Sequence, residues 1–119
     1  MKDVSFFSKI YIATSPVDFR KQSRSLAILV KEILECNPLE NRVLFVFTNK
    51  RKDSIRFLYW DQTGFALWNK VLEKDKYKWP KYLGKTKATL SSRELKWLLQ
   101  GIDLKRIKIH ESVSFNEIF

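Results

Sequence analysis

The sequence predicts an α+β domain, with a mostly antiparallel sheet of about four to five strands, one long N-terminal helix and one short C-terminal helix. Three observations support this fold class. Short apolar runs of strand length recur in the middle of the chain, a longer segment with helical spacing lies near the N-terminus, and a helix-capping motif begins at residue 91. Strands that follow one another directly favour antiparallel pairing, because a short turn is enough to join them.

Length and composition indicate a single folded domain. The chain has 119 residues, of which 45% are hydrophobic and 30% are charged, and this is enough apolar material for one core. We expect the domain to span residues 1–105. Residues 106–119 form a tail with several apolar positions, which either docks on the domain or frays.

The N-terminal third is expected to form a strand followed by the long helix. Residues 9–14 alternate and are rich in β-branched and aromatic types. Ser15 fits an N-cap, Pro16 fits the first helical position, and Asp18 fits the first turn, where a carboxylate faces the positive end of the helix dipole. The helix is expected to end before Pro38. Its apolar face consists of Phe19, Leu26, Leu29, Val30, Ile33 and Leu34.

The middle of the chain predicts a meander of strands. Residues 43–47 form a continuous apolar run, and residues 54–61 and 65–73 have the composition of a hairpin. Gly64 is expected to supply the positive φ of the hairpin turn. A further short strand is expected over residues 76–79.

A short helix is predicted near the C-terminus. In its capping box, the Ser91 side chain caps the helix and the Glu94 side chain reaches back to the capping residue. Leu95 and Leu98 supply an apolar face, and Gly101 is expected to close the helix.

The aromatic residues of the hairpin pose a choice between core and interface. Pairing across the turn gives the hairpin two apolar faces, one with Leu58, Trp60, Phe65 and Leu67, and one with Ile55, Phe57, Tyr59, Ala66 and Trp68. A small sheet normally leaves one face polar, so either helices cover both faces or one face packs on a partner. The candidates for core or partner interface are Tyr59, Trp60, Trp68 and Trp79.

The charge of the chain indicates an anionic partner. Lys and Arg number 23 against 13 Asp and Glu, which gives a net charge of +10. Such a balance suits a nucleic acid, an anionic membrane or an acidic protein. No apolar run approaches the ~20 residues of a membrane span, and the N-terminus lacks the pattern of a signal peptide. We therefore expect a cytoplasmic protein without membrane contact.

Two basic segments are the main candidates for phosphate contact. One is the turn over residues 48–53, which is also typical of a solvated hairpin tip. The other is the row Lys74, Lys76 and Lys78, which share one face if they lie in a strand. Such a row can either follow a phosphate backbone or protect a sheet edge from aggregation. The candidate DNA-binding residues are Arg20, Lys21, Lys50, Arg51, Lys52, Arg56, Lys70, Lys74, Lys76 and Lys78.

No catalytic constellation is visible in the sequence. There is no glycine-rich loop, and the single histidine, His110, lies in the tail. The single cysteine, Cys36, excludes an internal disulfide, and one Cys with one His cannot build a Cys/His zinc site. We therefore expect no catalytic residue, metal or cofactor. The alternative is a two-metal nuclease site, although each aspartate in it also fits a turn or a helix start. Its ligands would be Asp18, Asp53, Asp61 and Asp103.

Three motifs, in this order and spacing, resemble one protein family: YIATSPVDFRK, FVFTNKRKDSIRFLYWDQTGFALWNKVLEKDKYKWP and LSSRELKWLLQGID. The family is the small accessory protein from the second open reading frame of the IS66 group of bacterial insertion sequences. It is often labelled TnpB and is distinct from the RNA-guided nuclease of that label. The resemblance covers roughly residues 8–105, and Ser15 departs from it because the family usually has Gly there. The matching positions are Asp18, Arg20, Lys21, Asn49, Arg51, Asp53, Trp60, Asp61, Gly64, Lys70, Leu72, Glu73, Trp79, Pro80, Gly101, Ile102 and Asp103.

The resemblance implies an accessory role in DNA transposition, in which a DDE-type transposase from a larger frame cuts and joins the DNA. It implies a non-catalytic protein whose partners are DNA and the transposase of the same element. Our leading hypothesis is DNA contact through the basic surface. The alternative is a protein-binding adaptor that docks on the transposase, or self-associates, without direct DNA contact.

Overall fold

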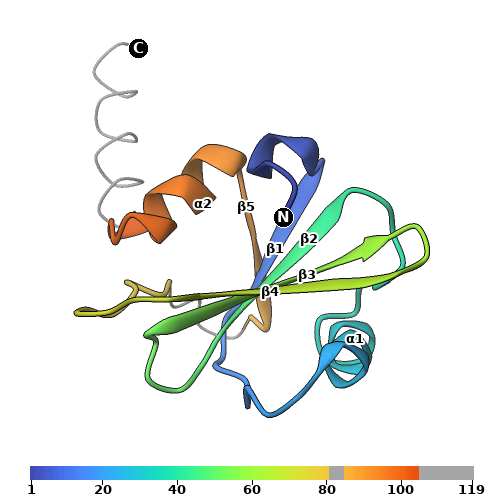
Figure 1. The fold of residues 1–119 in the computed structure, drawn as a ribbon, viewed down its shortest axis with the longest axis horizontal. Helices are drawn as coiled ribbons and strands as arrows, with labels where there is room; N and C mark the ends of the chain where they lie inside the picture. The colour runs from blue at the N-terminus through green and yellow to red at the C-terminus, as the bar shows by residue number, and fades with distance from the viewer. Residues whose placement is uncertain (81–84, 105–119) are drawn as a thin grey trace.

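A five-stranded mixed sheet forms the centre of the computed structural model, which describes residues 1–80 and 85–104 (Figure 1). The strands are β1 (Lys9–Ala13), β2 (Val43–Thr48), β3 (Ser54–Asp61), β4 (Gly64–Val71) and β5 (Lys87–Leu90), in the spatial order β4-β3-β2-β1-β5. β1 and β2 are parallel, and the other neighbouring strands are antiparallel. The α+β class is as predicted, but the sheet is mixed because a helical crossover joins β1 to β2.

The predicted long N-terminal helix is wrong. The helix α1 covers only 10 residues, Ser23–Glu32, and residues 15–22 before it form a loop. Its N-cap, Gln22, makes no side-chain hydrogen bond. The capping pattern that the sequence offers at Ser15 and Asp18 is therefore not used.

Contacts with the sheet hold the 15–22 loop out of the helix. The amide of Val17 donates to the carbonyl oxygen of Thr48 in β2 over 2.9 Å. The guanidinium of Arg56 in β3 donates through Nη1 to the carbonyl oxygen of Lys21 over 2.6 Å. These tertiary contacts decide the conformation of the loop against its local helical signals.

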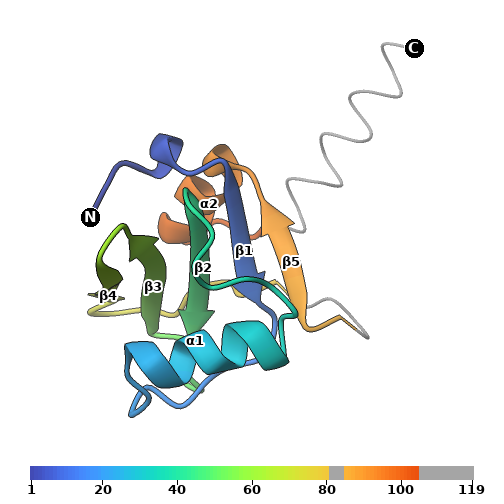
Figure 2. The same cartoon turned by 90° about the vertical axis from the view of Figure 1, so that its right-hand side faces the viewer.

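Helices cover both faces of the sheet. Figure 1 shows α1 on one side, and α2 (Ser92–Leu99) with the short 3-10 helix η1 (Val4–Phe6) on the other. The turned view in Figure 2 shows β4 and β5 at opposite edges of the sheet. Along β3, Leu58 packs in the cluster under α1, whereas Phe57 and Tyr59 pack in the cluster under α2. Both faces of β3 are thus covered by elements of the same chain, whereas Trp68 and Val71 on β4 remain exposed.

The pairing of β3 with β4 is the pairing that the sequence predicted. Phe57 lies opposite Trp68, and Asp61 lies opposite Gly64 at the turn. The positive φ, 56°, falls on Gln62 and not on Gly64, so that prediction is wrong. Gly64 already belongs to β4, and the left-handed conformation is needed only in the two-residue loop before it.

The strand predicted over residues 76–79 does not form, and β5 closes the sheet instead. The amide of Tyr77 donates to the carbonyl oxygen of Lys52 in a turn, not to a neighbouring strand. β5 has only four residues, and only Ala88 and Leu90 among them are apolar. Pairing with β1 therefore defines this strand, which is why its own sequence gave no clear signal.

The signals predicted for the C-terminal helix are confirmed. The amide of Glu94 donates to Ser91 Oγ, and the amide of Ser91 donates to Glu94 Oε1, each over 3.0 Å. Gly101 follows α2 with a φ of 84° and closes it. The predicted tail over residues 106–119, with His110, lies outside the described residues. None of the helices described is long and apolar enough to cross a bilayer.

Candidate functional site

Three segments that are distant in sequence meet beyond the carboxyl ends of β1 and β2. Val17 ties the loop over residues 15–22 to β2, as described above. The amide of Leu72 donates to the carbonyl oxygen of Asp53, and that of Tyr77 donates to Lys52, each over 2.8 Å. Figure 1 shows the turn after β2 and the chain after β4 at the same end of the sheet. The three segments are residues 15–22, 49–53 and 72–80.

Exposed cations gather at this place, which we call the basic end of the sheet. The strand end of β4 adds Lys70, and Lys52 in the turn is half-buried. Lys85, which the sequence did not single out, also lies there, because its carbonyl oxygen accepts a hydrogen bond from Thr14 Oγ1 over 2.6 Å. The exposed members are Arg20, Lys21, Lys50, Arg51, Lys70, Lys74, Lys76, Lys78 and Lys85.

Side-chain hydrogen bonds shape the turn of the basic end. Asn49 Nδ2 donates to Asp53 Oδ1 over 2.7 Å, and the amide of Ser54 donates to Asn49 Oδ1 over 3.2 Å. The hydrogen bond from Asn49 holds the pKa of the Asp53 carboxyl below its usual range. Two of the family-motif residues thus close the turn, which leaves Lys50 and Arg51 exposed at its tip.

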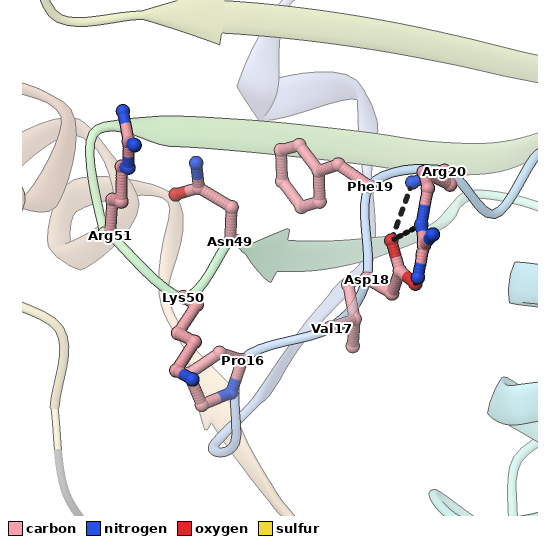
Figure 3. Close-up of a pocket in the computed structure, with 8 residues that line it drawn as sticks. All are labelled: Pro16, Val17, Asp18, Phe19, Arg20, Asn49, Lys50 and Arg51. Carbon is pink, nitrogen blue, oxygen red and sulfur yellow. Dashed lines mark hydrogen bonds and ion pairs between the residues drawn. The ribbon is translucent and has the colours of Figure 1, made fainter.

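A hollow of about 630 Å³ lies between the 15–22 loop and this turn (Figure 3). In Figure 3 the ring of Phe19 points from the loop toward Asn49 on the opposite wall. The residues that line the hollow are Pro16, Val17, Asp18, Phe19, Arg20, Asn49, Lys50 and Arg51. The hollow therefore combines an aromatic ring with three cations.

An ion pair forms one side of the hollow. Arg20 Nη2 lies 2.7 Å from Asp18 Oδ2, and the amide of Arg20 donates to Asp18 Oδ1 over 2.9 Å. These hydrogen bonds lower the pKa of Asp18 from 3.8 to about 2. Because the pKa is depressed, the carboxylate keeps its charge and its partner as the pH falls, until the pH approaches 2. The predicted role of Asp18 at a helix N-terminus is replaced by this pair.

Arg56 supports the hollow from behind. Its Nε donates to Asn69 Oδ1 over 2.6 Å, and its guanidinium carbon lies 4.5 Å from the centre of the Phe19 ring. Burial lowers the pKa of Arg56 from its usual value. With the bond to Lys21 described above, these contacts direct Arg56 toward the loop. It is therefore a support of the loop and not an exposed cation.

The lysines after β4 alternate with buried aromatic residues. Tyr77 and Trp79 are only 2% and 6% exposed, whereas the lysine that precedes each of them, Lys76 and Lys78, is exposed. The indole Nε1 of Trp79 donates to the carbonyl oxygen of Ala13 over 2.9 Å and so anchors the segment on β1. No strand forms here, so the predicted regular ladder is wrong. The buried rings nevertheless keep the lysines on the surface of the basic end.

The other motif residues lie in different places. Glu73 and Pro80 flank the lysines of the 72–80 segment, whereas Gly101 and Asp103 follow α2. Asp61 lies at the hairpin turn, at the opposite end of β3 from Asp53. The aspartates of the alternative nuclease site are thus separated, and no group of three possible metal ligands occurs in residues 1–80 and 85–104.

The aromatic candidates divide into buried and exposed residues. Tyr59 and Trp79 belong to the cluster under α2. Trp60 is half-buried and packs edge-on against Phe65, with ring centres 5.1 Å apart. Trp68 is 47% exposed on the edge strand β4. Phe19 was missed as a site residue because helical spacing placed it in the core, although it stands inside the first motif.

Comparisons with known proteins agree on one group. The family model described as IS66 Orf2 like protein matches residues 8–109. The uncharacterized protein y4jC of Sinorhizobium fredii (strain NBRC 101917 / NGR234) is 37% identical over 100 residues, which cover 84% of each chain. The uncharacterized protein y4hO of the same strain is 36% identical over 95 residues, which cover 80% of this chain and 81% of the relative. No solved structure matches the chain.

Proposed function

The chain belongs to the IS66 Orf2-like family of insertion-sequence accessory proteins, and we propose that it contacts DNA through the basic end of its sheet. We further propose that it acts in the cytoplasm as a non-catalytic partner of its element's transposase. The cutting and joining of DNA are left to the transposase.

The observation that carries this proposal is the gathering of exposed cations on three tied segments. These nine exposed cations outnumber the acidic residues of the three segments, which are Asp18, Asp53, Glu73 and Asp75. Lys50 and Arg51 have no hydrogen bond to another side chain within the described residues. A nucleic acid carries closely spaced negative phosphates, which attract a protein surface with exposed cations.

A DNA titration tests the proposal. We expect the protein to bind a labelled duplex at about 50 mM salt, with an affinity that falls steeply at about 200 mM, because each neutralised phosphate adds about 0.9 to the log–log slope. Fluorescence anisotropy measures both affinities. No binding at the lower salt concentration excludes DNA contact, and metal-dependent nicking of the duplex contradicts a non-catalytic role.

Exposed apolar residues on β4 favour the second candidate, a protein-binding adaptor. Trp68 and Val71 are 47% and 58% exposed, and β4 is an edge strand of the sheet. Large aromatic residues are enriched in the centres of protein interfaces. An adaptor that docks on the transposase would place this edge in the interface.

A pull-down with the cognate transposase tests the adaptor. We expect Trp68→Ala to abolish co-purification in nuclease-treated lysate, because truncation removes the largest exposed ring of the edge. Leu39→Ala is the matched control, since Leu39 is 51% exposed elsewhere on the surface. Equal retention of both variants in the treated lysate contradicts an interface at Trp68, whereas loss of the wild-type complex on nuclease treatment leaves DNA as the link between the two proteins.

A further inference from the structure

The lining of the hollow has an apolar part and a cationic part. Pro16, Val17 and Phe19 from the loop supply apolar surface, and Arg20 with the two cations of the turn tip supplies positive charge. This division matches the two parts of a nucleotide, whose base is flat and whose phosphate is anionic. A phosphate contact alone has no need of the aromatic ring.

Phe19 is held in place without being fully buried. The guanidinium of Arg56 lies 4.5 Å from the ring centre, and Arg56 is itself fixed by hydrogen bonds to Asn69 and to the Lys21 carbonyl, each over 2.6 Å. The ring remains half-buried and lines the hollow. A ring fixed on a rigid support loses little conformational freedom when a base stacks on it.

Some polar side chains of the hollow already make hydrogen bonds within the protein, and others do not. Asp18 accepts hydrogen bonds from Arg20, and Asn49 both donates to Asp53 and accepts from Ser54. The side chains of Lys50 and Arg51, in contrast, make no hydrogen bond in the part of the chain that the structure describes. The donors that are open to a ligand are therefore those of the turn tip, beside the aromatic surface.

The shape of the hollow separates unpaired from paired DNA. Its volume of about 630 Å³ is of the size that receives small molecules. The bases of a duplex are stacked on one another, so they cannot enter a recess between two loops. An unpaired base can be splayed out and stacked on a side-chain ring.

From these observations we propose that the hollow binds one unpaired nucleotide of a DNA strand, with its base on Phe19 and its phosphate at Lys50 and Arg51. This proposal rests on the proposed DNA contact and adds a preference for single-stranded DNA. Duplex DNA contacts the exposed cations of the basic end, Lys50 and Arg51 among them, whereas a base stacks on Phe19 only where the strands separate.

Substitutions at Phe19 test the proposal. Phe19→Leu keeps an apolar side chain but removes the flat ring, and Phe19→Tyr keeps the ring. We expect Phe19→Leu to weaken binding to a labelled single-stranded oligonucleotide by about 5- to 150-fold, the range for loss of one stacked base. Phe19→Tyr should stay near wild type, and all three proteins should bind the duplex of the same sequence equally. Circular dichroism confirms that the variants are folded.

The outcomes separate this proposal from the proposed function. Equal single-strand affinity of Phe19→Leu and wild type overturns the nucleotide site, while salt-dependent duplex binding still supports DNA contact. If the wild-type protein binds neither the single-stranded oligonucleotide nor the duplex, the proposed DNA contact is itself overturned. Tighter binding to RNA of the same sequence overturns the assignment to DNA.

A measurement on the wild-type protein covers the case in which Phe19→Leu fails to fold. An oligonucleotide that carries 5-iodouracil is irradiated in complex with the protein, and the crosslinked peptide is identified by mass spectrometry. We expect the crosslink on Phe19, since the iodinated base reacts with a ring on which it stacks. Crosslinks confined to residues outside the hollow overturn the proposal.

Discussion

Trp79→Ala is expected to lower the free energy of unfolding by about 3–5 kcal/mol, the usual cost of truncating a buried aromatic side chain. Trp79 is only 6% exposed, and its indole N–H donates to the carbonyl oxygen of Ala13 over 2.9 Å. Truncation would leave a cavity under α2 and remove this hydrogen bond. Urea denaturation followed by circular dichroism measures the change.

Two variants show which part of Trp79 matters. Trp68→Ala is the matched control, because Trp68 is 47% exposed, and its truncation should cost less than about 1 kcal/mol. Trp79→Phe keeps most of the packing and loses the hydrogen bond, so it should cost about 1–3 kcal/mol. Equal destabilisation by Trp79→Ala and Trp68→Ala would contradict the buried position of Trp79.

The loss of Trp79 also has a consequence for the basic end. Its indole anchors the segment with Lys76 and Lys78 to β1, so the position of these lysines depends on a buried ring. At a urea-free condition where the variant is still folded, Trp79→Ala should bind duplex DNA with a smaller salt slope. The structural and functional effects of this residue therefore have one physical origin.

Replacing four cations of the basic end by alanine is expected to lower the log–log salt slope of duplex binding by about 3.6, or 0.9 for each phosphate that the variant no longer neutralises. Between about 50 and about 200 mM salt, the wild type should then lose about 100-fold more affinity than the variant. The four substitutions are Lys50→Ala, Arg51→Ala, Lys76→Ala and Lys78→Ala. All four side chains are exposed, so the fold should be retained.

A second variant with the same loss of charge is the control. Its cations lie away from the basic end, near η1 or at the other end of the sheet. Lys9 is the first residue of β1, and α2 begins directly after β5, whose last residue, Leu90, pairs with Ile10. It carries Lys2→Ala, Lys9→Ala, Arg93→Ala and Lys96→Ala. We expect its salt slope to stay close to that of the wild type. An equal drop in both variants shows that net charge and not the basic end governs binding.

Local signals predicted a large part of the fold. β3 has the predicted bounds, and its pairing with β4 follows from two strands joined by a short turn. The capping box at Ser91 and the closing Gly101 are also properties of a few neighbouring residues. Such signals can be read from sequence because both partners of each interaction lie within one turn or hairpin.

The errors fall where a distant segment decides the local conformation. The 15–22 loop carries helix-start residues, yet Thr48 and Arg56 hold its backbone in another conformation. β5 is a strand because β1 lies beside it. Residues 76–79 have strand composition, but Tyr77 bonds to a turn and Trp79 to the end of β1. None of these partners is near in sequence.

The sequence by itself determined the α+β class, though not the length of its first helix, together with the central strands, the excess of positive charge and, through its motifs, the family. Only the tertiary structure decided that the loop with Phe19, the turn with Lys50 and Arg51, and the segment with Lys76 and Lys78 form one surface. The physical reason is that the bonds that join them, from Val17 to Thr48 and from Tyr77 to Lys52, run between residues about 25 or more positions apart. Local propensity carries no information about such bonds, so the hollow between the segments becomes visible only once the sheet has formed.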